Sequence, residues 1–103
     1  MSITEFRDIL LSVDPLATHY EALSPVAPYT VWAEYSTKPL SADDESDETV
    51  LQIRVEYFTK AEYDATVSAF IAAFDQNGVA YSYTCEYYEE TKTIHHQFDC
   101  EVV

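Results

Sequence analysis

Apolar residues recur at two different spacings along the chain, and each spacing predicts one type of secondary structure. Near the N-terminus, one helical stripe is formed by Ile3, Phe6, Ile9, Leu10 and Val13. Ser2 and Glu5 have the spacing of a capping box, which favours the start of a helix at this point. Asp14 precedes Pro15 and is therefore pushed out of the helical region. The pattern predicts a helix between Ser2 and Asp14.

Two segments in the middle of the chain alternate between apolar and polar residues, as half-buried strands do. In residues 29–36 we expect a dry face with Tyr29, Val31, Ala33 and Tyr35, and a partly wet face with Thr30, Trp32, Glu34 and Ser36. In residues 49–58 the inward positions are Leu51, Ile53, Val55 and Tyr57. The two segments are predicted to form an antiparallel hairpin.

The rest of the chain has the pattern of a helix followed by a second hairpin. Thr59 and Glu62 have capping-box spacing, a helical stripe follows, and Asn77-Gly78 has the composition of a helix C-cap. The stripe consists of Tyr63, Val67, Phe70, Ile71 and Phe74. The hairpin has a predicted turn near residues 89–92, which places Cys85 opposite His96 or Phe98.

Together these elements predict an α+β fold in the order α-β-β-α-β-β. We expect a single four-stranded, mainly antiparallel sheet with both helices on one face. Residues 1–103 fit one domain of common size. Residues 37–48 are predicted to be a mobile loop, because like charges at high density repel. The acids that crowd this loop are Asp43, Asp44, Glu45, Asp47 and Glu48.

The net charge of −14, from 5 basic and 19 acidic residues, limits the possible partners. Such a chain repels nucleic acid phosphates and anionic lipid. The acids can serve solubility, line a passage through which DNA slides, or imitate DNA. No apolar run is long enough for a membrane span and no secretory signal is recognisable, so we expect synthesis in the cytosol and no membrane partner. Nine tyrosines exceed the need of one small core, which indicates a contact surface.

Residues with catalytic or metal-binding chemistry are present but lack a recognisable arrangement. In the cytosol Cys85 and Cys100 are expected to be free, buried thiols, and core packing is favoured over a zinc site shared with His96. His95 and Asp99 fit an acid–base pair, but no nucleophile motif accompanies them. The acidic loop lacks the ligand spacing of an EF-hand, and a single glycine excludes a phosphate-binding loop. We predict no enzyme activity, cofactor or metal.

The second face of the predicted sheet carries a mixture of aromatic and polar residues that is typical of an interface. Among these we expect Trp32, Arg54 and Phe58 to contact another subunit. For Trp32, cover by a helix or loop of the same chain is the alternative.

The predicted element order α-β-β-α-β-β resembles that of the tail terminator, or tail completion, proteins found in the necks of long-tailed phages and prophages, and so do three segments of the chain. They are Ala42-Asp43-Asp44 in the long loop, Gln-Ile-Arg-Val-Glu-Tyr-Phe-Thr-Lys at 52–60, which leads straight into a helix, and Phe-Asp-Cys-Glu-Val at 98–102. The resemblance covers about residues 29–103.

This resemblance implies a homo-hexameric ring in the virion, assembled in the cytoplasm of a bacterial host. Such a ring caps the tail tube, stops tube growth and joins the tail to the head, with the tail tube protein and a head-connector protein as partners. DNA passes through without specific binding, and the loop acids named above would line the lumen or the loop tip. Family members often carry more basic residues than this chain, which leaves open which surface faces tube and which faces head.

Two other functions fit the same composition. One is a small acidic inhibitor that mimics DNA and occupies a nucleic-acid-binding protein, although five acids in one loop are not spread along an extended face. The other is a different head–tail joining protein with the same sheet.

Overall fold

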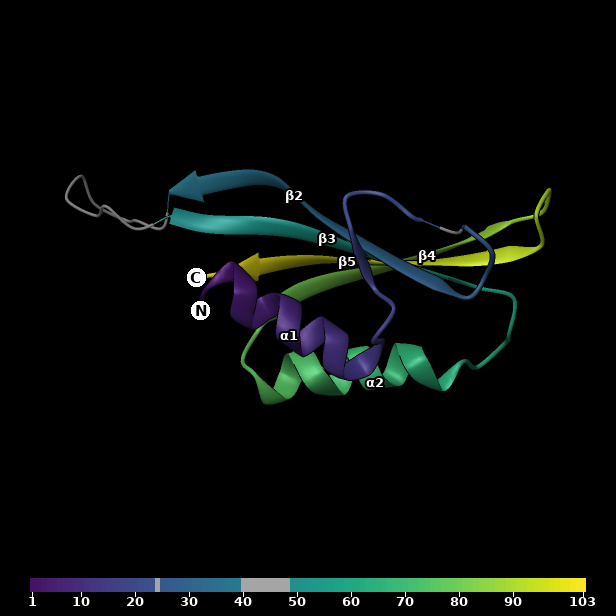
Figure 1. Cartoon of the computed structure of the whole chain (residues 1–103), viewed down its shortest axis with the longest axis horizontal. Coiled ribbons are helices and arrows are strands. Elements are labelled where there is room, and N and C mark those ends of the chain that lie inside the picture. The colour runs from purple at the N-terminus through teal and green to yellow at the C-terminus, as the bar shows by residue number, and fades with distance from the viewer. Residues whose placement is uncertain (24, 40–48) are drawn as a thin grey trace.

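The computed structural model describes residues 1–23, 25–39 and 49–103, which form two helices and one five-stranded sheet (Figure 1). The elements in chain order are α1 (Ile3–Val13), β1 (Thr18–His19), β2 (Tyr29–Pro39), β3 (Thr49–Thr59), α2 (Ala65–Gln76), β4 (Ala80–Tyr88) and β5 (Thr93–Val102). The strand order across the sheet is β1-β2-β3-β5-β4. In the described ranges, no helix is long and apolar enough to cross a membrane.

The prediction of a four-stranded, mainly antiparallel sheet is wrong, because the sheet has a fifth strand and is mixed. β1 pairs in parallel with β2, with Thr18 opposite Val31 and His19 opposite Trp32. The backbone N–H of Tyr20 extends this contact by donating to the carbonyl oxygen of Trp32 over 2.7 Å. A strand of two residues is too short to show an alternation of apolar and polar residues. The predicted order α-β-β-α-β-β, which rests on such patterns, therefore lacks this strand.

The two helices begin at different kinds of cap. α1 has the predicted capping box of Ser2 and Glu5. α2 begins at the N-cap Asp64, so the predicted capping box of Thr59 and Glu62 is wrong, and β3 continues through Thr59. Gly78 follows the C-cap of α2 with φ 66°, the left-handed conformation expected there.

Both helices lie on the same face of the sheet, which is therefore the core face (Figure 1). Phe6 of α1 and Phe74 of α2 stack with ring centroids 6.1 Å apart, and Phe74 meets Phe98 of β5 edge-on at 5.4 Å. The buried core cluster consists of Phe6, Leu10, Trp32, Ile53, Val55, Tyr57, Phe70, Phe74, Val79, Phe98, Cys100 and Val102.

The expected assignment of the two faces of β2 is wrong. Thr30 and Trp32 face the core, and Trp32 is only 3% exposed. The register with β3 explains this, because Trp32 lies opposite the buried Val55. The Thr30 hydroxyl is also satisfied inside, since it donates to Asp14 Oδ2 over 2.6 Å.

β2 and β3 form the predicted antiparallel hairpin, with an irregularity between Glu34 and Ser36. β2 reaches Pro39, so residues 37–39 of the predicted loop are strand. The remaining loop, with Asp43, Asp44, Glu45, Asp47 and Glu48, lies outside the described residues.

The two edges of the sheet differ. The β2 edge is partly covered by β1, is irregular near Tyr35, and carries Lys38, all of which discourage edge pairing. β4 forms the other edge for nine residues and contains no Lys, Arg or Pro. In the part of the chain that the structure describes, no strand covers its outer side.

Candidate functional site on the open face of the sheet

The face of the sheet opposite the helices, called the open face below, is the candidate site. Alternate residues of four strands project from it, because successive side chains of a strand point to opposite faces. Its central positions are Tyr29, Val31 and Ala33 of β2, Arg54, Glu56 and Phe58 of β3, His95, Gln97 and Asp99 of β5, and Thr84, Glu86 and Tyr88 of β4.

Four rings from four different strands form an aromatic row across the open face. Tyr29 stacks on Phe58 with centroids 4.6 Å apart, and Phe58 stacks on His95 at 4.4 Å. The Tyr88 hydroxyl is hydrogen-bonded to His95 Nδ1 over 2.8 Å. The four rings therefore form a continuous row across the four strands.

The environment of the aromatic row is partly desolvated and negatively charged. Burial, together with Glu56 and Tyr88, raises the pKa of Tyr29. His95 is 9% exposed, and its Nε2 makes no hydrogen bond within the described part of the chain. Glu56 Oε1 lies 3.7 Å from this nitrogen.

A polar cluster adjoins the row. Arg54 Nε donates to Asp99 Oδ1 over 2.8 Å, and Gln97 Nε2 donates to Asp99 Oδ2 over 3.1 Å. The Arg54 guanidinium also lies 4.7 Å from the centre of the Tyr35 ring. The hydrogen bond from Arg54 to Asp99 raises the pKa of the guanidinium, which stays charged. Asp99 thus pairs with Arg54, and no hydrogen bond between Asp99 and His95 is found among the described residues.

The predicted site residues are thus found in three different places. Arg54 and Phe58 lie on the open face, and both are half-buried. Trp32 lies in the core, and the acids of residues 43–48 are outside the described residues. From the sequence alone, His95 is considered only as part of an acid–base pair, and Tyr29 is expected on the dry face of its strand. The observed register of β2 with β3 and of β3 with β5 places both residues beside Phe58.

His96, Cys85 and Cys100 do not lie on the open face but on the core face of the sheet. Cys85 lies opposite His96, as predicted, and Cys100 lies opposite Tyr81, so both thiols are free. Cys85 is exposed, contrary to expectation, whereas burial raises the pKa of Cys100 to about 12. Burial lowers the pKa of His96. The described ranges hold no cluster of three His, Cys, Asp or Glu residues suited to a metal ion.

The fold has a solved counterpart. It is similar to a chain in a structure described as the virion of a native gene transfer agent particle. The match covers 89% of this chain and 81% of that chain, with 15% sequence identity and a TM-score of 0.55. At this identity the likeness establishes the fold alone. No protein-family model and no curated protein sequence matches the chain.

Proposed function

We propose that this chain is a structural protein of a phage or phage-like virion, and specifically a tail terminator. In this role it caps the tail tube as a ring of about six copies and joins the tail to the head. The observation that carries the proposal is the fold shared with a virion chain over 89% of the residues. The sequence resemblance to tail terminator proteins supports the specific role. This role requires no enzyme activity.

The open face supplies the contact surface for this assembly. Protein interfaces are enriched in Tyr, Phe and Arg, and the open face presents all three in a fixed arrangement. Arg54 and Phe58 are the proposed contacts with a neighbouring copy or with a partner protein. Trp32 is excluded from this contact surface, because it is 3% exposed in the chain.

The strong negative charge fits a protein that DNA passes without binding. A net charge of −14 repels the phosphates of DNA. This repulsion lowers the non-specific affinity of the protein for DNA. Asp43, Asp44, Glu45, Asp47 and Glu48 are proposed to face the lumen of the ring or to form the loop tip. The proposed partners are the tail tube protein and a head-connector protein, and the proposed location is the virion, assembled in the host cytoplasm.

The test is a tube-growth assay with the polymerising tail tube protein encoded by the same genome. A terminator added in small amount stops growth, so negative-stain images show shorter tubes with a ring at one end. Tubes that are equally long with and without excess protein would overturn the proposal. Light scattering over a concentration series identifies a preformed ring.

The same experiments separate the alternatives. Another head–tail joining protein would leave tube length unchanged and bind the head connector. A DNA mimic would remain a monomer or dimer and compete with DNA for a nucleic-acid-binding protein.

A further inference from the structure

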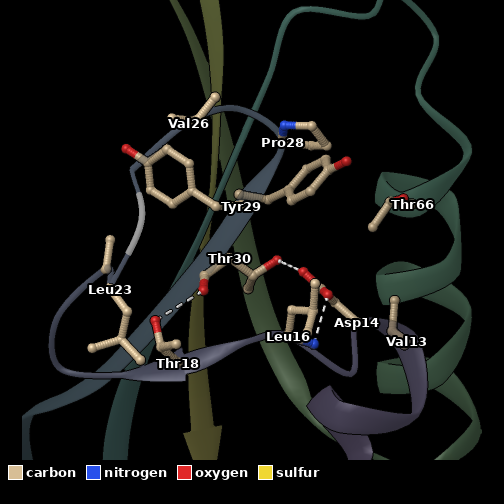
Figure 2. A pocket seen from close by; sticks show the side chains of 12 residues that line it. Val13, Asp14, Leu16, Thr18, Leu23, Val26, Pro28, Tyr29, Thr30 and Thr66 are labelled. Carbon is tan, nitrogen blue, oxygen red and sulfur yellow. Dashed lines mark hydrogen bonds between the residues drawn. The ribbon is translucent and has the colours of Figure 1, made fainter.

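The connector between α1 and β2 encloses a hollow of about 500 Å³. Figure 2 shows Leu23 and Val26 on the connector at one side of the hollow and Thr66 of α2 at the other. The end of α1 and the start of β2 close the remaining sides (Figure 2). The connector hollow therefore lies at the junction of both layers, and Tyr29 of the aromatic row is one of its lining residues.

The rim of the connector hollow is unusually apolar for a solvent-facing segment. Leu16 is 85% exposed, Leu23 is 81% exposed and Val26 is 75% exposed. Single exposed aliphatic residues are common on protein surfaces. Three such residues line this one hollow, and a group of exposed apolar side chains is typical of a binding surface.

Three of the polar side chains that line the hollow, those of Asp14, Thr18 and Thr30, already have partners within the chain. Asp14 Oδ2 accepts from the Thr30 hydroxyl over 2.6 Å, and Asp14 Oδ1 accepts from the Leu16 backbone N–H over 3.0 Å (Figure 2). The Thr18 hydroxyl donates to the Thr30 carbonyl oxygen over 3.4 Å. The walls therefore favour aliphatic groups over a hydrogen-bonding ligand. The volume falls within the range of about 300–1,000 Å³ that is usual for ligand pockets.

Charge decides between a second copy and a foreign protein as the occupant. The sequence contains no Lys or Arg between Arg7 and Lys38, whereas Asp14 and Glu21 lie in the connector. A second copy would bring a further charge of −14. Three of its five basic side chains already pair with acids of their own chain, namely Arg7 with Asp8, Lys38 with Glu101 and Arg54 with Asp99. A copy of this chain is thus a poor electrostatic match for the connector hollow.

We infer that the connector hollow binds an aliphatic segment of a different protein, flanked by Lys or Arg residues. The aliphatic side chains enter the hollow and cover Leu16, Leu23 and Val26. The flanking bases lie close to the carboxylate of Glu21 in the connector, which makes the contact selective. This inference does not depend on the proposed tail-terminator function.

The experiment uses two synthetic helical peptides with the same leucines on one face. One peptide carries lysines at all other positions and the second carries glutamates. Backbone amide resonances of the whole chain are followed by NMR during titration at physiological salt. We expect the lysine peptide to shift resonances of residues around the connector hollow, and the glutamate peptide to cause no shifts.

Variants separate specific binding from general attraction to an acidic protein. The double variant Leu16→Ser and Leu23→Ser keeps the net charge and is expected to bind the lysine peptide about tenfold more weakly. Tyr87→Ser, at an exposed aromatic residue of β4, is the matched control and should bind like the parent chain. Circular dichroism checks that each variant is folded.

Four results would overturn the inference. They are binding of neither peptide, equal binding of both peptides, unchanged binding of the lysine peptide by the double serine variant, or shifts confined to other regions. In addition, a parent dimer that the double serine variant dissociates in light scattering would assign the hollow to a second copy.

Discussion

The hydroxyl of Thr59 donates a hydrogen bond of 2.7 Å to Oδ2 of Asp64, which ties the end of β3 to the N-cap of α2. The Tyr57 hydroxyl donates to the same oxygen over 2.7 Å, and the Thr66 backbone N–H donates to Oδ1 over 2.9 Å. Burial alone would raise the pKa of Asp64. The hydrogen bonds from Thr59, Thr66 and Tyr57 outweigh it and lower this pKa to about 2.

Replacing Asp64 by Asn should destabilise the fold at neutral pH. A carboxyl group with a depressed pKa stabilises the folded state above its unfolded pKa of about 4, and this contribution is lost as the pH falls through about 2. Allowing for solvent screening, we expect Asp64→Asn to cost about 1–2 kcal/mol at pH 7. Denaturant unfolding at pH 7, 4 and 2 measures this cost.

The variant should also lose part of the pH dependence of the parent chain between pH 4 and 2. Asp75→Asn, at an exposed position of the same helix, is the matched control. If Asp64→Asn and the parent chain lose stability in parallel on acidification, the role assigned to the Asp64 carboxylate is wrong.

Trp32 provides a direct optical test of the face assignment of β2. It is the single tryptophan of the chain, it is 3% exposed, and it stacks on His19 with centroids 3.9 Å apart. We expect blue-shifted emission that resists acrylamide quenching in the folded state and moves to the red on unfolding. Trp32→Ala should cost about 3–5 kcal/mol, because it leaves a cavity beside Phe6. Emission typical of exposed indole in the folded chain would contradict the assignment.

Arg54 and Phe58 should matter more for assembly than for the stability of one chain. The ion pair of Arg54 with Asp99 is partly exposed, so Arg54→Ala should cost no more than about 1 kcal/mol. We expect this variant and Phe58→Ser to reduce assembly strongly, as measured by light scattering and by the tube-growth assay. Lys92→Ala removes an exposed base elsewhere and is the control. Normal assembly of both open-face variants would place the contact on another surface.

Neutralising the acidic run at Asp43, Asp44, Glu45, Asp47 and Glu48 with Asn and Gln should leave the fold intact. We expect impaired DNA passage or assembly, because the repulsion of phosphates would be weakened. Circular dichroism measures the fold, and infectivity of a phage that carries the substitutions measures passage. Glu89→Gln with Glu90→Gln, in the exposed turn between β4 and β5, is the control for loss of charge alone. Unchanged infectivity of the acidic-run variant would remove the lumen assignment.

Strong local patterns made much of the secondary structure predictable. The stripe of α1 and the alternation of β3 and β5 follow directly from residues such as Phe6, Ile53 and Phe98, which are all fully buried. Gly78 marked the end of α2, because its left-handed conformation favours glycine. Arg54 and Phe58 could be placed on the open face for the same reason, since the alternation of β3 is regular.

Long-range pairing accounts for the errors. The two residues of β1 form a strand only because they pair with β2. The local sequence pattern of β1 does not predict this pairing. In β2 both faces carry large apolar residues, so the choice between Val31 and Trp32 as inward residue depended on the register with β3. The cap of α2 at Asp64 is supported by hydroxyl groups of β3, whereas the predicted box relied on sequence spacing alone.

The uncovered edge of β4 has a consequence for handling the purified protein. Nine residues of strand without Lys, Arg or Pro can pair with the same strand of another molecule. At neutral pH the charge of −14 keeps molecules apart, but this repulsion vanishes near the isoelectric point of about 4.2. Acid elution or dialysis through that pH should therefore yield ordered aggregates rich in β-structure, and buffers well above it should keep the protein dispersed.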